Sequence, residues 1–207
     1  MLVALLAATS AAATTVDMND PRRALGREDD VRVDAQLHQD TVTPGSPVGV
    51  VYQIENMTAR PVAIADKTAD CSYDPETRTV TLAIGSEIPA SGNLPHMVII
   101  APGEKKTFSA SALLRVNLPS VRSPFIAEPR FVQVKVNILR DLAPFAPLLE
   151  RQTKTPASAI SLTDAQFDQW MESNDAIFLN AIPVRYSPRS RNNSTDAERR
   201  ESATGSF

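Results

Sequence analysis

The sequence is poor in the residues from which several kinds of site are built. Cys71 is its only cysteine, so no disulfide can form within the chain and a disulfide framework is excluded. Seven glycines in 207 residues leave little from which to build a phosphate-binding loop. Neither a phosphate-binding motif, nor a dinucleotide fingerprint, nor a G-x-S-x-G nucleophile elbow occurs. We therefore expect no cofactor.

The chain also lacks a strong charge of either sign. The formal net charge is −3 and charged residues make up 22% of the sequence. No basic field is present to attract nucleic acid, so a nucleic-acid partner is not expected. No apolar run is long enough to span a bilayer comfortably, so we expect no membrane span.

The sequence starts with a short apolar run that is followed by small residues. Residues 1–17, MLVALLAATSAAATTVD, combine an apolar stretch with small residues, as a secretory signal peptide does. The small side chains of Ala11 and Ala13 predict cleavage after Ala12 or Ala13. We expect residues 1–13 to be a signal peptide and the protein to be exported, to the periplasm or the outside. The alternative is a disordered, alanine-rich start of a cytosolic protein.

The sequence does contain many short segments in which apolar side chains alternate with a period of two. About eight such strands, with no strong helical pattern among them, are predicted between Val31 and Arg140. Parallel strands would need crossover helices, so the spacing is typical of an antiparallel β-sandwich. Sixteen prolines suit short strands joined by stiff loops. The clearest alternating runs are Val31–Leu37, Val48–Ile54, Val80–Ile84, Phe108–Val116 and Val132–Ile138.

The stretch Thr41–Asp66 reads as three short strands separated by turns. Its turn and entry residues are Pro44, Gly45, Pro47, Val48, Asn56, Thr58, Pro61 and Val62. In this pattern the stretch resembles strands B and C of immunoglobulin-like β-sandwich domains in bacterial envelope and secreted proteins. The resemblance implies an all-β, immunoglobulin-like antiparallel β-sandwich of about seven or eight strands, with a short C-terminal helical extension. It implies an architecture and no activity.

Changes in composition divide the chain into segments. Residues 14–30 are charged and lack a period, which predicts a linker between the signal peptide and the first strand. The sandwich is predicted over 31–141, and a C-terminal extension with a short helix over 142–186. Residues 187–207 are polar and have too few apolar side chains to offset the entropy of ordering, so we expect a disordered tail.

The predicted helix in the extension carries the strongest candidate for a partner contact. Thr163 with Gln166 three residues later forms a capping box, and Phe167, Trp170 and Met171 follow as an apolar stripe. This stripe either docks on the sandwich or binds a protein partner. Phe125, in the proline-flanked loop Asn117–Pro129, is a third candidate partner residue.

Catalytic and metal-binding residues are few. Neither His38 nor His96 lies in a zinc-type spacing, and a Cys71–His96 nucleophile pair would need the fold to bring them together. The acids Asp66, Asp70, Asp74 and Glu76 match no EF-hand loop, and Asp74 before proline is explained as a turn residue. The triplet Asn56-Met57-Thr58 matches a glycosylation acceptor, as does the run from Asn192 to Thr195.

Two hypotheses for the function follow. The first is a non-enzymatic binding or structural module of the cell envelope, or a secreted one, that meets a protein partner through loops or a sheet edge. The second is a proteinase-inhibitor-like or chaperone-like protein that acts through a loop or an edge strand. An enzyme comes third, because it needs Cys71, His96 and acids to converge.

Overall fold

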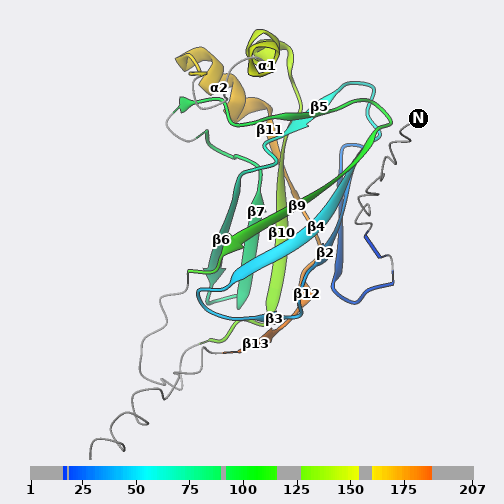
Figure 1. Ribbon diagram of the computed structural model, residues 1–207, viewed down its shortest axis with the longest axis vertical. Helices are drawn as coiled ribbons and strands as arrows, with labels where there is room; N and C mark the ends of the chain where they lie inside the picture. The colour runs from blue at the N-terminus through cyan, green and yellow to red at the C-terminus, as the bar shows by residue number, and fades with distance from the viewer. Residues whose placement is uncertain (1–15, 18, 90–91, 116–126, 154–159, 188–207) are drawn as a thin grey trace, which may run out of the picture.

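Two β-sheets lie face to face, and short helices cover one end of them (Figure 1). The structure, a computed structural model, describes residues 16–17, 19–89, 92–115, 127–153 and 160–187. Strands account for most of the regular structure, so the predicted all-β, sandwich-like fold is confirmed.

The first sheet has four antiparallel strands. Their order across the sheet is β1 (Arg23–Glu28), β2 (Val31–Leu37), β4 (Pro47–Asn56) and β9 (Lys105–Leu113). The predicted alternation is confirmed in β4, where Val48, Val50, Tyr52 and Ile54 are at most 3% exposed. The other set of side chains points away from the second sheet and forms the outer face of the first.

The second sheet is built around β10 (Phe131–Leu139), which has neighbours along both edges. Val136 lies between Ile84 of one neighbour and Ile177 of the other. The neighbours that pair directly with β10 are β7 (Thr79–Ile84), β5 (Val62–Ile64), β11 (Asn174–Phe178) and β12 (Ile182–Pro183). Beyond them lie β6 (Ala69–Asp74), next to β7, and β8 (Val98–Ile100), next to β5. The predicted central place of β10 is therefore confirmed.

One pairing in this sheet differs from the expected antiparallel arrangement. Strands β7 and β10 run parallel, with Val80 opposite Val132 and Ile84 opposite Val136. Between them the chain passes through β8 and then crosses to the first sheet to form β9. Parallel neighbours need a crossover connection. The prediction considered helical crossovers alone, whereas here a strand of the opposite sheet makes the crossing.

The predicted linker over 14–30 is wrong for Arg23–Glu28, which forms β1 and pairs with β2 along its whole length. The inward-facing residues of β1 are Ala24 and Gly26, and both are buried. Because these side chains are so small, no hydrophobic period is visible in the sequence. A Cβ added to Gly26 would lie 2.9 Å from the carbonyl oxygen of Phe178. The close approach of the C-terminal part of the chain therefore requires glycine there.

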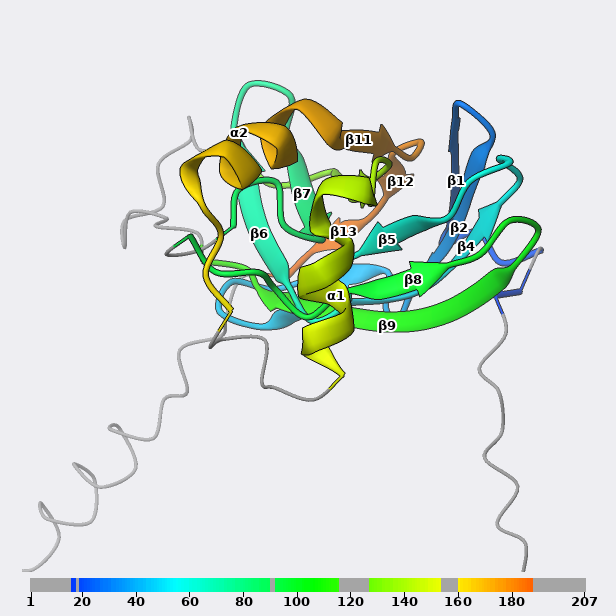
Figure 2. The ribbon, with the colours of Figure 1, turned by 90° about the horizontal axis from the view of Figure 1, so that it is seen from above.

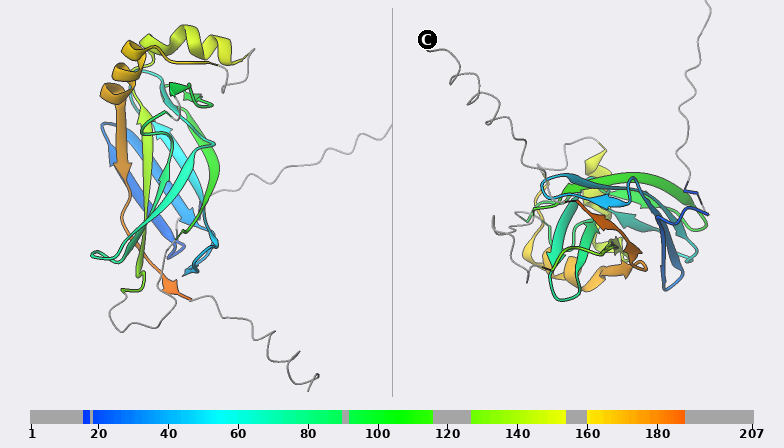
Figure 3. Two further views of the ribbon diagram at one scale, coloured as in Figure 1. Left: turned by 90° about the vertical axis from the view of Figure 1, so that its left-hand side faces the viewer. Right: turned by 90° about the horizontal axis from the view of Figure 1, so that it is seen from below.

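The predicted boundary of the sandwich at residue 141 is also wrong. The turn η2 (Ala143–Phe145) and the helices α1 (Ala146–Gln152) and α2 (Asp164–Ser173) lie over one end, as Figure 2 shows. The chain then runs as β11 and β12 along β10 to the opposite end (Figure 3). There β13 (Arg185–Tyr186) pairs with β3 (Thr41–Val42). The C-terminal residues thus complete the second sheet.

Helix α2 starts as the sequence predicts. The Thr163 hydroxyl accepts a hydrogen bond from the Gln166 N–H, and the Gln166 side chain accepts one from the Thr163 N–H. This reciprocal capping satisfies two backbone donors that have no partner within the helix. Because a helix of this length is marginal alone in water, its apolar stripe needs a surface to cover.

That surface is the end of the sandwich. Trp170 is 1% exposed, and its indole N–H points at the carbonyl oxygens of Ser86 and Glu87 at 3.3 and 3.2 Å. The ring of Phe145 meets the indole edge-on, with 5.7 Å between the ring centroids. Helix α2 is therefore docked, and Trp170 anchors it.

The turn after β4 is held by a buried asparagine. The Asn56 side chain is inaccessible to solvent and donates to the carbonyl oxygens of Arg60 and Ile100, at 2.8 and 2.9 Å. Its own oxygen accepts from the N–H and the hydroxyl of Thr58. All of its polar groups are thus used inside the fold, so this triplet is a structural turn and not an accessible glycosylation acceptor.

We expect Val134→Ala to lower the free energy of unfolding by about 2 to 3 kcal/mol, because it removes two buried methyl groups from the inner face of β10 and leaves a cavity. Urea denaturation measures this change. The matched control is Gln133→Ala on the opposite face of the same strand. It removes one weak hydrogen bond, from the Gln133 side chain to the Leu179 carbonyl at 3.3 Å, so a change of about 1 kcal/mol or less is expected. Equal losses for the two variants would contradict the buried, central place of the strand.

The enclosed indole predicts a blue-shifted fluorescence emission that resists quenching by iodide. Trp170 is the only tryptophan in the sequence, so the signal reports this site alone. Trp170→Phe should destabilise the protein by about 1 to 3 kcal/mol, because the carbonyls of Ser86 and Glu87 lose their indole donor and volume is lost. A red-shifted, freely quenched emission from the folded monomer would contradict the docked helix.

Candidate functional site

Of the predicted partner-binding residues, the structure describes Phe167 and Trp170, and it does not bring these two to one exposed surface. Trp170 is enclosed at the end of the sandwich, so the predicted partner contact is wrong for this residue. Phe167 is half-buried on α2. Phe125 lies outside the described residues.

The structure also keeps the candidate catalytic residues apart. Cys71 lies in β6 with its side chain in the hydrophobic core, and it makes no hydrogen bond with His96. His96 is instead paired with Asp66, its Nδ1 lying 2.7 Å from a carboxylate oxygen. Burial and, to a smaller extent, the nearby Asp70 carboxylate together raise the pKa of the Cys71 thiol to about 12. A thiol in this environment stays protonated and is a poor nucleophile.

Within the acidic run around β6, Asp74 holds the turn that follows that strand. Asp74 accepts hydrogen bonds from the Thr77 hydroxyl at 2.7 Å and from the Glu76 N–H at 2.9 Å. The Thr77 hydroxyl, followed by the Glu76 N–H, lowers the pKa of the Asp74 carboxyl. In the part of the chain that the structure describes, no three His, Cys, Asp or Glu side chains gather as metal ligands would.

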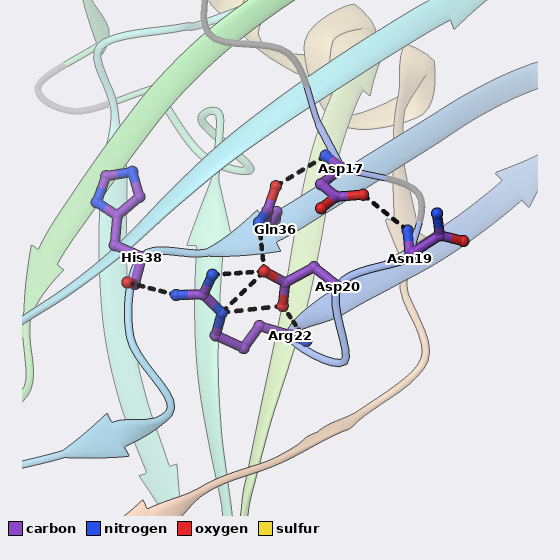
Figure 4. A network of polar contacts seen from close by, with 6 residues as sticks. All are labelled: Asp17, Asn19, Asp20, Arg22, Gln36 and His38. Atoms are coloured by element: carbon purple, nitrogen blue, oxygen red, sulfur yellow. Dashed lines mark hydrogen bonds and ion pairs between the residues drawn. The ribbon is translucent and has the colours of Figure 1, made fainter.

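A polar network lies at the outer face of the first sheet (Figure 4). The Arg22 guanidinium donates to both carboxylate oxygens of Asp20 and, at 2.9 Å, to the carbonyl oxygen of His38. Gln36 donates to Asp20 at 2.7 Å and accepts from the Asp17 N–H at 2.9 Å. The network binds the segment before β1 to the face of β2, a contact that the linker prediction missed.

The charges in this network satisfy one another. Hydrogen bonds from the Arg22 side chain, then from its backbone N–H, hold the pKa of the Asp20 carboxyl far below its usual range. The same contact raises the pKa of Arg22. A hollow of about 560 Å³ next to the network is lined by Asp20, Pro21, Arg22, Asp40 and Pro183. Both carboxylates of the lining are paired, Asp20 with Arg22 and Asp40 with Arg185, so neither is free to hold a charged ligand.

The histidine of the network points away from it and covers a glycine. In Figure 4 the imidazole of His38 is directed away from Arg22. A Cβ added to Gly49 would lie 2.6 Å from the Nδ1 of His38, so the ring lies directly over the backbone of β4. Beside it a hollow of about 330 Å³ is lined by His38, Gln39, Pro47, Gly49, Ser109 and Ser111. The hollow therefore reaches from the middle of the sheet to its last strand, β9.

The edges of the sheets differ in how they are covered. The edge of β1 is bonded to the C-terminal segment that contains β11 and β12, which we call the C-terminal strap. Leu25 donates to the Asn180 side chain at 2.6 Å and accepts from the Asn180 N–H at 3.1 Å. In β8, the carbonyl oxygen of Ile99 accepts from the Lys106 ammonium at 2.6 Å. The edge strand β6 carries the charges of Asp70 and Asp74. Such bonds and charges protect an edge from pairing with another chain.

Strand β9 has none of these protections over Thr107–Leu113. It pairs with β4 on one side, and no second strand pairs with it within the described residues. The side chains along this stretch that face outward are Thr107, Ser109, Ser111 and Leu113, and all of them are exposed. Figure 2 shows β9 along one margin of the fold. An uncharged, regular edge without proline or bulge is a template for strand addition.

The backbone groups that are free along β9 follow from its pairing. Leu114 exchanges hydrogen bonds with the β4 side, to Ser46 and Gly45, and the Glu104 carbonyl accepts from Asn56 at the other end. In an antiparallel pair, successive residues direct their N–H and C=O groups to opposite edges. The even-numbered residues of β9 therefore bond to β4, and the odd-numbered ones direct both groups to the open edge.

The edge of β9 and the hollow beside it form one continuous candidate site, which we call the β9 edge. A strand added along β9 would place alternate side chains next to Ser109 and Ser111, whose small size leaves the hollow over Gly49 open. A longer side chain could lie across either serine and reach His38. In such a complex the backbone bonds would supply affinity and the hollow selectivity. The sequence predicted the strand and its faces, but it held no signal of which edge stays unpaired.

Comparison with protein-family models, curated proteins and solved structures finds no match to this chain. The immunoglobulin-like affiliation drawn from Thr41–Asp66 therefore stays a prediction. Of the helices described, none has the length and the apolar character that crossing a bilayer requires.

We expect Cys71 to react slowly with a thiol reagent at pH 8 in the folded protein and rapidly after unfolding. The raised pKa, about 12, leaves almost no thiolate at pH 8, and burial limits access. Following the labelling with and without urea measures both rates. Rapid labelling of the folded protein, at the rate of a free thiol, would contradict the buried position of this residue.

Proposed function

We propose that the protein is a non-enzymatic protein-binding module that takes up an extended segment of its partner as an additional strand at the β9 edge. The mode of action is the edge-strand hypothesis drawn from the sequence, now assigned to one strand. The observation that carries the proposal is the uncharged outer edge of Thr107–Leu113, which has no strand partner among the described residues.

The hollow over Gly49 supports the same proposal. A bare edge would pair with many extended chains, because main-chain hydrogen bonds carry no sequence information. A cavity at its margin, lined by His38 and two serines, gives preference to a partner with a side chain that fills it. We propose that this side chain lies next to Ser109 or Ser111.

An enzymatic function is the weaker candidate. It would need a nucleophile with a base within hydrogen-bond reach. Cys71 is buried with a raised pKa, and His96 is paired with Asp66 instead. Export of the protein to the periplasm or the outside belongs to this proposal, and its support is the signal-peptide pattern of residues 1–13.

The test replaces an amide at the open edge. Ser109→Pro removes an N–H that points away from β4, so it should block strand addition while it leaves the β4–β9 ladder in place. Used as bait in an extract of the exporting cell, the protein beginning at Thr14 should capture a partner that Ser109→Pro does not. Ser109→Ala, which keeps the N–H, should capture the partner as the unmodified protein does.

Amide hydrogen exchange provides a second measurement. With the partner bound, the amides of Thr107, Ser109 and Ser111 should become protected, while those of Phe108 and Ala110 are already protected by β4 in the free protein. Partner capture that survives both Ser109→Pro and Thr107→Pro would overturn the proposed use of the β9 edge.

A further inference from the structure

We infer that, in the absence of a partner, the β9 edge pairs with the β9 edge of a second copy of this chain. The inference rests on the proposed function, because it names what occupies the same edge in the resting state. The two chains would form one continuous eight-stranded sheet across a two-fold axis. Self-pairing of this kind covers an edge that the fold otherwise leaves open.

The register follows from the groups that face the open edge. The odd-numbered residues of β9 direct their N–H and C=O groups outward, so odd residues must lie opposite odd residues in an antiparallel pair. With the two-fold axis at Ser109, that residue faces its own copy and Thr107 faces Ser111. These cross-strand neighbours are small hydroxyl side chains that can hydrogen-bond to one another.

This register also keeps like charges apart. Lys105 lies opposite Leu113 of the second copy, which is half-exposed at 50% in the single chain and would gain an apolar contact with the lysine stem. The two Lys105 residues end up at opposite ends of the paired strands, about 27 Å apart for eight residues of extended chain. Each ammonium remains next to Glu55 of its own chain, 3.2 Å away.

The second copy is a replaceable occupant because it leaves the hollow empty. It places two short side chains, those of its own Ser109 and Thr107, opposite Ser109 and Ser111 at the margin of the hollow. A partner strand with a longer side chain makes the same backbone bonds and fills the hollow as well. Partner binding should therefore compete with self-pairing. In the free protein the β9 edge should be covered in a reversible dimer.

Sedimentation of the full chain from low micromolar to near millimolar concentration tests the inference. The weight-average mass should rise from that of one chain towards twice that value. Ser109→Pro and Thr107→Pro should each weaken dimerisation about tenfold or more, while Ser109→Ala should dimerise like the unmodified chain. An excess of a synthetic peptide with the sequence Lys105–Leu113 should return the mass to that of one chain.

The outcomes separate this inference from the proposed function. A chain that stays monomeric throughout the range overturns self-pairing, and partner capture that is sensitive to Ser109→Pro would then still support the β9 edge as a binding site. A dimer that neither proline variant weakens also overturns the inference, because its interface lies elsewhere. Hydrogen exchange on the unmodified chain is a check that needs no variant: the amides of Ser109 and Ser111 should gain protection as the concentration rises.

Discussion

The pairing of β10 on both of its edges is the constraint on which the rest of the fold depends. Its inner side chains, Val132, Val134, Val136 and Ile138, are all fully buried. Its two edges bond strands that come from widely separated parts of the chain, among them β7 and β11. Helix α2 leads directly into β11, so the pairing of β11 with β10 holds α2 at the end of the sandwich. The chain that leaves β11 then bonds to β1.

Completing β10 has a consequence for the remaining edges of the sandwich. The C-terminal strap that pairs with β10 also passes β1. Asn180 bonds to the backbone of β1, and the absence of a side chain at Gly26 lets the strap approach closely. At the opposite seam β6 and β9 lie side by side, yet no hydrogen bond joins them among the described residues. The fold thus closes one seam with hydrogen bonds, whereas at the other the outward N–H and C=O groups of β9 have no strand partner among the described residues. The proposed binding site at β9 rests on this difference between the two seams.

Where the sequence was informative, the reason is periodicity. In strands such as β4 and β10 the inner residues are large and apolar and the outer ones are polar, so the period of two is visible without the fold. The capping box of Thr163 and Gln166 is local in the same sense, because both partners lie within four residues. Strand β1 shows the limit: its inner residues are Ala24 and Gly26. The space at Gly26 is limited by Phe178, a residue more than a hundred and fifty positions later.

The candidate site depends on the same distinction. The sequence by itself predicted a strand over Phe108–Val116, with Phe108, Ala110 and Ala112 on one face and Ser109 and Ser111 on the other. The structure confirms these faces and places the strand at Lys105–Leu113. Only the tertiary structure decided that this strand lies at the end of its sheet, that Gly49 and His38 lie beside it, and that β7 pairs with β10 in parallel. Alternation of side chains is a property of neighbouring residues, whereas the identity of a strand's neighbours is set by contacts between distant segments competing for the same core.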